Sequence, residues 1–387
     1  MDLSFTPGQQ AFRQGLRDWL AENLAPGWGG PRFTGPDDEA ENARFQIDWE
    51  RRLYAAGYQG IHWPQAYGGQ GLTAVEQLIA AEELGRVSAP EGINTLGKEL
   101  VGPIVLAVGS EEQKKHYIPR ILRLDDIWCQ GFSEPDAGSD LAGLRTRAVL
   151  DGDHWVVNGQ KLWTSFAHHA NKCILLARTD PDAPKHKGLT LFLLDMDTPG
   201  VTVRPLRQIT DRHEFNEVFL EDVRIPAGMH LGAVNEGWHA AVGVLGFERA
   251  TARLYRQARF QAEFDALLKL LAARPDKASD GWFRQQVGAH AADLNVLRLL
   301  NLKTASRIAN GKGIGSEASI VKLFWSELHQ RIMAFASEVL DEAFANGDPE
   351  AERFRFLYLQ SRAETIYAGT SEIQRNIIAE RMLGLPR

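Results

Sequence analysis

The chain has 387 residues, of which 44% are hydrophobic and 24% are charged, proportions that are typical of a globular enzyme. Its formal net charge of −7 at pH 7 and its isoelectric point near 5.9 argue against binding of a nucleic-acid backbone as the main function. No apolar run approaches the roughly 18 residues that a membrane-spanning helix needs, so we expect no membrane span.

Cysteine is rare in this sequence, since Cys129 and Cys173 are the only two. Two cysteines in a chain of this length cannot build a disulfide framework, which fits a reducing compartment. The first ten residues show no basic segment followed by an apolar one, so we expect no secretory leader. The sequence therefore favours a cytoplasmic location.

The N-terminal part of the chain, from residue 6 to about 125, has the apolar spacing of amphipathic helices. Two helix starts are marked by capping boxes, in which a hydroxyl and a carboxyl or amide three residues later satisfy the first backbone N–H groups. The two boxes pair Thr73 with Glu76 and Ser110 with Gln113. We therefore expect a helical first domain.

From about residue 127 the apolar residues occur in short runs rich in β-branched side chains. Turn pairs such as Asp151-Gly152 and Asn158-Gly159 separate the runs, because these pairs favour tight hairpin turns. The pattern predicts a compact β domain with strands at residues 144–150, 153–157, 173–178, 189–194, 201–204 and 217–220.

Helical spacing returns at Glu236 and continues to the C-terminus. The expected helices cover residues 236–273, 280–310, 316–345, 350–366 and 371–383. Runs of helices, then strands, then helices indicate an α+β protein of several domains. We place the domain boundaries at residues 1–126, 127–235 and 236–387.

Three segments carry residues that point to chemistry. Gly131–Asp140 (GFSEPDAGSD) follows a predicted strand and offers hydroxyls and backbone N–H groups able to contact a polar cofactor. Asn158–Ser165 (NGQKLWTS) is a turn followed by a strand with one Trp and two adjacent hydroxyls. Each segment alone is also compatible with a plain surface turn. Together, and in this order with Tyr367–Thr370 (YAGT), they are far more specific.

In this combination the motifs resemble those of the acyl-CoA dehydrogenase family, flavoenzymes that desaturate acyl thioesters. The resemblance covers nearly the whole chain and includes Trp63-Pro64, Gly68-Gly69 and Glu221–Pro226 (EDVRIP). It implies a helical N-terminal domain, a central β-barrel-like domain and a C-terminal domain like a four-helix bundle. It also implies FAD, held between the β domain and the C-terminal helices, usually across a subunit interface.

The resemblance assigns cofactor contacts to positions in these motifs. The flavin ring is expected to contact Phe132, Ser133, Trp163, Thr164 and Ser165. The adenosine half is expected to contact Thr370 and Glu372. Such contacts position the flavin and tune its electronics, while the redox chemistry belongs to the cofactor.

The catalytic base is missing from its usual place. In most of the family the residue after the motif's Tyr is the glutamate that removes the substrate's α-proton, but here it is Ala368, whose methyl group cannot accept a proton. Some members carry the base in a Glu-Arg pair on the first long C-terminal helix, and Glu248-Arg249 falls at that position. Burial among apolar neighbours raises a carboxyl pKa toward the value that removal of a C–H proton requires. We therefore expect Glu248 to be the base.

Ala368 keeps a second role of this position. The resemblance implies that its backbone N–H, together with a ribityl hydroxyl, hydrogen-bonds the thioester carbonyl and stabilises enolate-like charge. Loss of a glutamate side chain at the substrate also suggests a bulkier or branched acyl group. Further substrate contacts are expected from Ser139, which reaches the CoA pantetheine, and from Leu245, Arg249, Tyr367 and Gly369.

Two segments depart from the family pattern. The usual Arg-Lys-x-Phe-Gly reads Arg274–Ala278 (RPDKA), and the usual Gly-Gly-x-Gly is replaced around Glu338–Ala343 (EVLDEA) by a segment without glycine. Both segments help to hold the FAD of a neighbouring subunit, and Arg274 is the one contact retained. Some bacterial members form hetero-oligomers in which one subunit has an incomplete cofactor site, and this chain fits that description too.

The sequence leaves three functions open. The first is FAD-dependent dehydrogenation of an acyl-CoA by a homo- or hetero-oligomer, dimer or tetramer, with an electron-transfer flavoprotein as acceptor. The second is an oxygen-using flavin oxidase on the same fold, and the third is a non-catalytic or half-site subunit. A DNA-associated role is disfavoured by the negative charge. No metal site is expected, because His168-His169 has no Cys or carboxylate at metal-ligand spacing in the sequence.

Overall fold

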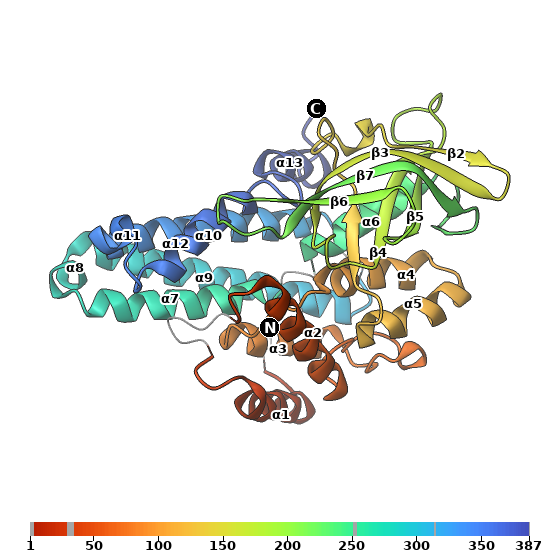
Figure 1. Cartoon of the computed structure of the whole chain (residues 1–387). Helices are drawn as coiled ribbons and strands as arrows, with labels where there is room; N and C mark the ends of the chain where they lie inside the picture. The colour runs from red at the N-terminus through yellow and green to blue at the C-terminus, as the bar shows by residue number, and fades with distance from the viewer. Residues whose placement is uncertain (1–3, 29–34, 251–253, 313–314, 387) are drawn as a thin grey trace. The chain divides into compact units, whose positions relative to one another are not determined.

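The computed structural model of the chain describes residues 4–28, 35–250, 254–312 and 315–386, without the side chains of residues 244–250. These residues form two compact units. The first unit contains residues 1–36, 71–90 and 249–387, and the second contains residues 37–70 and 91–248 (Figure 1). The three-domain division expected from the sequence stays a prediction. The two compact units divide the N-terminal helices between them, with residues 71–90 in the first unit and residues 37–70 in the second.

The first unit is helical, and its longer C-terminal helices α7, α9, α10 and α12 run side by side (Figure 1). Apolar side chains such as Phe260, Leu328 and Ile332 are fully buried between them and form the core of this unit. Its helices are α1 (Pro7–Asn23), α3 (Ala74–Arg86), α7 (Arg256–Ala272), α8 (Pro275–Ser279), α9 (Gly281–Ala309), α10 (Glu317–Leu340), α11 (Glu342–Asn346), α12 (Glu352–Glu364) and α13 (Ser371–Ile377), with a π-turn at Ile378–Met382.

The C-terminal helices differ from the expected ones at two breaks. The span 236–273 contains α6 (Gly237–Ala250) and α7, with residues 251–253 outside the described part. The span 316–345 is divided at Asp341, whose φ of +46° ends α10 before the short α11 begins. A left-handed residue cannot continue a right-handed helix, and the apolar spacing on both sides of Asp341 concealed this break.

The second unit packs helices against one mixed sheet. Its helices are α2 (Glu39–Ala55), α4 (Gly102–Val108), α5 (Glu111–Arg123) and α6, with short turns of helix at Gln65–Tyr67, Gly97–Val101 and Leu141–Gly143. The strands are β1 (Trp128–Gly131), β2 (Arg147–Asp151), β3 (His154–Ser165), β4 (Lys172–Arg178), β5 (Leu189–Asp195), β6 (Val201–Leu206), β7 (Phe215–Pro226) and β8 (His230–Leu231). Their order is β6-β7-β3-β2-β4-β5-β8, with β1 paired in parallel to β4.

All six predicted strands are present, and the α+β fold class is confirmed. One turn was predicted wrongly, since Asn158-Gly159 lies inside β3 and forms a register shift against β7 where a hairpin turn was expected. Asn158 and Asp222 exchange two hydrogen bonds across this shift, of 2.9 and 3.0 Å. A Cβ at position 159 would come within 2.3 Å of Thr146 Oγ1, so the glycine permits close packing of β2 against β3.

The predicted helix starts are correct. Thr73 and Ser110 form capping boxes with Glu76 and Gln113, and Thr6 forms a third one with Gln9 that the sequence reading missed.

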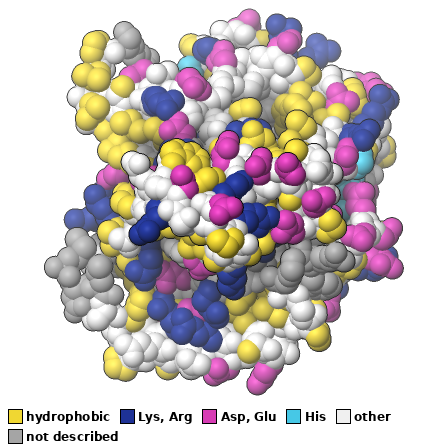
Figure 2. Space-filling view, turned by 90° about the vertical axis from the view of Figure 1, so that its left-hand side faces the viewer, with side chains coloured by type: hydrophobic (Ala, Val, Ile, Leu, Met, Phe, Trp, Pro, Cys, Tyr) yellow, Lys and Arg dark blue, Asp and Glu magenta, His cyan; other side chains and the backbone are white. Residues whose placement is uncertain are grey.

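The surface carries mixed charge. On the face shown in Figure 2, acidic and basic side chains are interspersed with apolar ones. Among the described residues, no helix combines the length and the apolar character needed to cross a bilayer.

Candidate functional site

A bulge at the end of β3 exposes the aromatic residue of the second motif. Between Lys161, which pairs with Val218 of β7, and Thr164, which pairs with Asn216, two residues of β3 lie opposite one residue of β7. A β-bulge of this kind bends a strand and re-aims its side chains. Trp163 lies in the bulge with a φ of +60° and 57% of its surface exposed. The second unit thus presents an indole ring at its surface.

A buried ion pair supports the bulge. Lys161 Nζ lies 2.8 Å from Glu134 Oε1 and donates to the carbonyl oxygen of Phe132 at 3.1 Å. The backbone N–H of Leu162 donates to the carbonyl oxygen of Ser133 at 2.8 Å. These contacts bring the first and second motifs together, so five of the residues assigned to the flavin ring lie in one region of the fold.

Glu134 is the acidic anchor of this region. Its carboxylate accepts hydrogen bonds from the backbone N–H groups of Arg145 and Thr146, at 2.6 and 2.9 Å. Burial acts to raise the pKa of Glu134, but the charge of Lys161 and these hydrogen bonds lower it overall. Glu134 is therefore ionised and fixed at neutral pH.

The Thr164 hydroxyl is unpartnered. Thr164 is fully buried, and its Oγ1 has no hydrogen-bond partner within the described part of the chain. Its carbonyl oxygen accepts from Asn216 Nδ2 at 2.9 Å, which fixes the backbone on the same residue. Buried hydroxyls are almost always hydrogen-bonded, so this oxygen is suited to bind a polar group from a ligand.

In the first unit, the turn between α12 and α13 carries the third motif. Ala368 and Gly369 both adopt left-handed backbone, with φ of +55° and +88°. Thr370 caps α13 by accepting from the N–H of Ile373 at 3.2 Å, and Gln374 Nε2 donates to the carbonyl oxygens of Ala368 and Gly369 at 2.9 and 3.2 Å. The backbone N–H of Ala368 has no acceptor among the described residues, so the turn is held by its carbonyls while one amide stays available.

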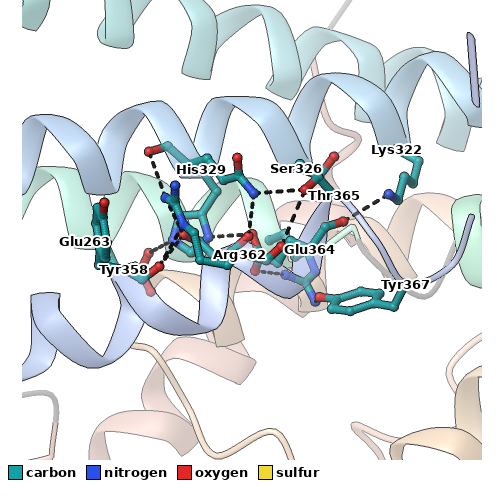
Figure 3. A network of polar contacts seen from close by, with 12 residues as sticks. Glu263, Lys322, Ser326, His329, Tyr358, Arg362, Glu364, Thr365 and Tyr367 are labelled. Atoms are coloured by element: carbon teal, nitrogen blue, oxygen red, sulfur yellow. Dashed lines mark hydrogen bonds and ion pairs between the residues drawn. The ribbon is translucent and has the colours of Figure 1, made fainter. Parts of the chain in front are cut away.

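A chain of buried polar contacts holds Tyr367, the residue before this turn (Figure 3). Arg256 Nη2 donates to the Tyr367 hydroxyl at 2.7 Å, and Arg256 Nη1 donates to Glu364 Oε1 at 2.7 Å. Glu364 Oε2 lies 2.7 Å from His329 Nδ1, whose Nε2 lies 3.2 Å from Glu263 Oε2. We call these five residues the Tyr367 network. It connects α7, α10 and α12 to the turn.

The charges of the network are paired. His329, Glu263 and Glu364 have side chains that are only 2–4% exposed. Burial acts to lower the pKa of His329, but Glu364 and Glu263 raise it to about 9. For Glu364, burial acts to raise the pKa, while the charges of His329 and Arg256 lower it overall. At neutral pH the network therefore contains an imidazolium between two carboxylates, an arrangement that offsets the desolvation of each charge.

A surface cavity of about 610 Å³ lies beside the turn, between α10, α12 and the start of α13. Thr370 and Glu372, which were assigned to the adenosine half of the cofactor, both line it. The guanidinium groups of Arg331, Arg362 and Arg375 also line it, together with the carboxylate of Glu327. Arg375 pairs with Glu327, and Arg331 pairs with Asp293. The cavity is therefore polar and carries charges of both signs.

One predicted residue, Arg274, lies away from the turn that carries Thr370. Arg274 precedes α8, at the other end of the helical bundle from α13 (Figure 1), and its guanidinium pairs with Glu350 at 2.5 Å. Ser139 is exposed on the loop that follows β1. Within one chain, Arg274 and Thr370 are therefore not brought together.

Three further predictions lie outside what the structure describes. Leu245, Glu248 and Arg249 belong to α6, but their side chains are not described. The assignment of Glu248 as base thus stays a prediction.

The sequence reading missed the buried charges behind both regions. Glu134 and Lys161 lie inside the motifs, and a charged residue in an otherwise apolar strand was a usable signal.

The charges behind the turn after α12 left a weaker signal. Arg256 and Glu364 are 108 residues apart, and no local pattern pairs them. His329 lies among Leu328, Ile332 and Met333, and a histidine on an apolar helix face was the only sign of it.

The chain is similar to known proteins over nearly its whole length. Three family models match, described as the N-terminal, middle and C-terminal domains of acyl-CoA dehydrogenase, at residues 6–125, 129–223 and 235–383. Acyl-CoA dehydrogenase IpdE1 of Mycobacterium tuberculosis is 41% identical over 380 residues, which cover 98% of each chain. FadE29, an acyl-CoA dehydrogenase of the same organism, is 33% identical and covers all of this chain.

Two solved structures are similar over their whole length. A steroid acyl-CoA dehydrogenase named Tcur3481-Tcur3483 has a TM-score of 0.87 at 30% identity, with full coverage of both chains. The ChsE4-ChsE5 complex from Mycobacterium tuberculosis has a TM-score of 0.84 at 30% identity, again with full coverage.

Proposed function

The chain belongs to the acyl-CoA dehydrogenase family and is an acyl-CoA dehydrogenase, and on that premise we propose its mechanism, cofactor and substrate class. The reaction is FAD-dependent α,β-dehydrogenation of an acyl-CoA thioester, with Glu248 removing the α-proton. The observation that carries the proposal is the unpaired backbone N–H of Ala368, which lies in a turn fixed by Gln374 and by the Tyr367 network.

The residues of the second unit fit a flavin. Thr164 offers a buried hydroxyl without a partner in the described chain, and Trp163 offers an exposed aromatic surface. When bound, FAD supplies the acceptor for the hydride that leaves the substrate's β-carbon. Phe132, Ser133 and Ser165 contribute neighbouring backbone and hydroxyl groups that orient the ring. Thr370 and Glu372 line the cavity that we assign to the adenosine half.

The proton and the developing charge are handled by two residues of this chain. Glu248 accepts the α-proton in this scheme. Leu245 and Phe247, its neighbours in the sequence, are apolar, and apolar surroundings raise the pKa of a carboxyl toward the value that this task requires. The Ala368 N–H donates to the thioester carbonyl oxygen as that oxygen becomes negative. A fixed backbone donor of this kind costs no reorganisation during the reaction.

The Tyr367 network positions that donor. Its imidazolium and guanidinium keep the Tyr367 hydroxyl in place, so the turn that follows Tyr367 starts from a fixed point. Gln374 fixes the other end through the two carbonyl oxygens. The amide is thus oriented before substrate arrives. Gly369 and Tyr367 contact the acyl end of the substrate in this scheme, together with Leu245 and Arg249.

For the substrate, we propose a bulky ring-containing acyl group, such as one derived from a steroid. Two observations support this. A similar full-length structure is that of a steroid acyl-CoA dehydrogenase, and an alanine at position 368 leaves space that a glutamate would fill. Ser139, on an exposed loop, contacts the pantetheine of CoA in this scheme.

The assembly proposed is a hetero-oligomer with an electron-transfer flavoprotein as acceptor. The glycine-free segment Glu338–Ala343 and the engagement of Arg274 with Glu350 support an incomplete FAD contribution from this chain. The similar ChsE4-ChsE5 structure is a complex of two named proteins. Measuring FAD per chain in the native assembly tests this, and one FAD per chain in a homo-oligomer would contradict it.

The mechanism is tested by Glu248→Gln in the flavin-loaded native assembly. We expect the rate of flavin bleaching by acyl-CoA to fall by about 10²–10⁴-fold, because general-base catalysis contributes that much, while the resting flavin spectrum stays unchanged. Glu236→Gln, an exposed carboxyl just before the same helix, is the matched control and should bleach normally.

Each alternative function predicts a different outcome, in that experiment or in a companion measurement. Normal bleaching in Glu248→Gln would remove Glu248 from the mechanism. Peroxide release during turnover would identify an oxidase. A panel of linear, branched and steroid-derived acyl-CoA thioesters tests the substrate class, and preference for short linear chains would contradict it.

A further inference from the structure

Glu39, His168 and His169 meet at one place in the second unit, although the sequence separates them widely. Glu39 is the first residue of α2, and the two histidines lie in the turn between β3 and β4. His168 Nε2 lies 2.9 Å and His169 Nε2 lies 3.8 Å from the same oxygen, Glu39 Oε1. One ligand atom from each of the three residues lies within 4.8 Å of the others.

The tautomer of His168 is fixed by a buried amide. Asn216 is fully buried, and its Nδ2 donates to the carbonyl oxygens of Thr164 and Glu214, at 2.9 and 3.4 Å. Its Oδ1 therefore faces His168 Nδ1, 2.9 Å away, and accepts the proton that this nitrogen carries. Neutral His168 then has its lone pair on Nε2, the nitrogen that faces Glu39.

The lone pair of His168 Nε2 and the carboxylate oxygen Glu39 Oε1 lie 2.9 Å apart. Two acceptors this close repel each other unless a cation lies between or beside them. The cation is either a second proton on His168 or a metal ion. A histidine whose far nitrogen is held by an amide or carboxylate oxygen is the usual arrangement at metal sites, because the outer contact orients the ring.

His169 supplies the second imidazole. Its Nε2 faces the same Glu39 oxygen, 3.8 Å away. The two rings are close, with centroids 4.0 Å apart. The side chains of Glu39, His168 and His169 are 58%, 15% and 23% exposed, so water can reach the remaining coordination position.

We propose that Glu39, His168 and His169 bind a divalent transition-metal ion, of which Zn²⁺ is the best match. Two imidazoles, one carboxylate and water form a ligand set that zinc accepts. With zinc–ligand distances of about 2.0–2.1 Å, tetrahedral ligands lie roughly 3.4 Å apart. The separations of 2.9 and 3.8 Å bracket that value, so a small adjustment of the Glu39 side chain suffices.

The site has a structural connection to the end of β3. Asn216 contacts both His168 and the carbonyl oxygen of Thr164. A bound metal would therefore immobilise the turn that follows Thr164 and Ser165. The site itself does not depend on the proposed dehydrogenase mechanism.

The test is metal binding by the full chain in its native assembly, free of any polyhistidine tag and treated first with a chelator. We expect one Co²⁺ per chain with the visible absorption of a low-symmetry site, displaced by one Zn²⁺. Glu39→Gln and His169→Asn should each weaken Zn²⁺ at least tenfold in calorimetric titration. His154→Gln, a histidine on β3 beside Asp153 and outside the cluster, is the control and should bind normally.

Two further readouts keep the result clear. Zn²⁺ should raise the melting temperature of the natural protein and of His154→Gln, but not that of Glu39→Gln. Both cysteines are buried, so they do not compete for the metal. Absence of stoichiometric binding, or equal binding by Glu39→Gln and His169→Asn, would overturn the proposal and leave a proton as the link between His168 and Glu39.

Discussion

The end of β3 and the turn after α12 place unusual backbone in different ways. Trp163 and Ala368 both have positive φ, at +60° and +55°. At Trp163 the strand ladder to β7 continues on both sides, and one buried ion pair, Lys161–Glu134, supports it. At Ala368 no ladder exists, and the support comes from the Tyr367 network and from Gln374.

The difference shows that the surrounding secondary structure sets how many buried charged groups are needed to hold a residue with positive φ. A residue inside a sheet is already constrained by hydrogen bonds of its neighbours, so a single pair completes the support. A residue in a connection between helices needs long-range polar contacts. Substitutions at the two places should distinguish the single ion pair at β3 from the several contacts that hold the turn.

The largest effect is expected for Lys161→Met. It leaves Glu134 buried without its countercharge, and breaking a buried pair in this way costs about 3–5 kcal/mol. The loss should appear as a lower unfolding midpoint in urea. The double variant Lys161→Met with Glu134→Gln should recover part of the loss, since no unpaired charge remains. A Lys161→Met protein as stable as the natural one would remove the pair as the main support.

A smaller, pH-dependent effect is expected for His329→Gln. The folded pKa of His329 is raised to about 9, above the unfolded value of about 6.5. Its contribution to stability is therefore fully present below pH 6.5 and is lost as the pH rises through 9. The stability advantage of the natural protein over the variant should be about 3 kcal/mol larger at pH 6 than at pH 10.

His290→Gln is the matched control for that profile. His290 is also buried, but burial and the charge of Arg331 lower its pKa. The stability associated with its neutral form is present above pH 6.5 and is lost as the pH falls. Melting curves between pH 6 and 10 should separate the two variants. A His329 profile that is flat between pH 6.5 and 9 would contradict the imidazolium.

The smallest effect is expected for Tyr367→Phe. It removes the hydrogen bond from Arg256 but leaves the Arg256–Glu364 pair intact. Loss of one charge-assisted hydrogen bond, about 1.5 kcal/mol, should lower kcat about tenfold and leave KM within about twofold, because the oriented amide acts in the transition state. Tyr358→Phe on α12 is the control. A change confined to KM would show that Tyr367 only binds substrate.

Much of the fold could be predicted from the sequence because its signals are local. Capping at Thr73 and Ser110 depends on residues three positions apart, and the strand runs depend on alternation and turn pairs. The family followed from motifs in a fixed order, and it is confirmed. The break at Asp341 escaped prediction because a positive φ at an aspartate leaves no mark in the apolar spacing.

The support of the site could not be predicted, because it depends on contacts over long sequence distances. Glu263 and Glu364 flank His329 from 66 and 35 residues away. Glu39 approaches His168 only through packing of α2 near the β3–β4 turn. Motifs identify the residues at the surface of a site, and the fold alone reveals the charges that hold them.

The left-handed backbone at Ala368 has a consequence for how inactive relatives are recognised. Under the proposed mechanism this position contributes an amide and no side chain, so its natural variation is limited only by the torsion of +55° and by space for the acyl group. Small residues and asparagine would satisfy both demands, whereas valine or isoleucine would not. A survey that demands glutamate at this column would misclassify working enzymes as pseudoenzymes, and a β-branched residue there would be the better warning sign.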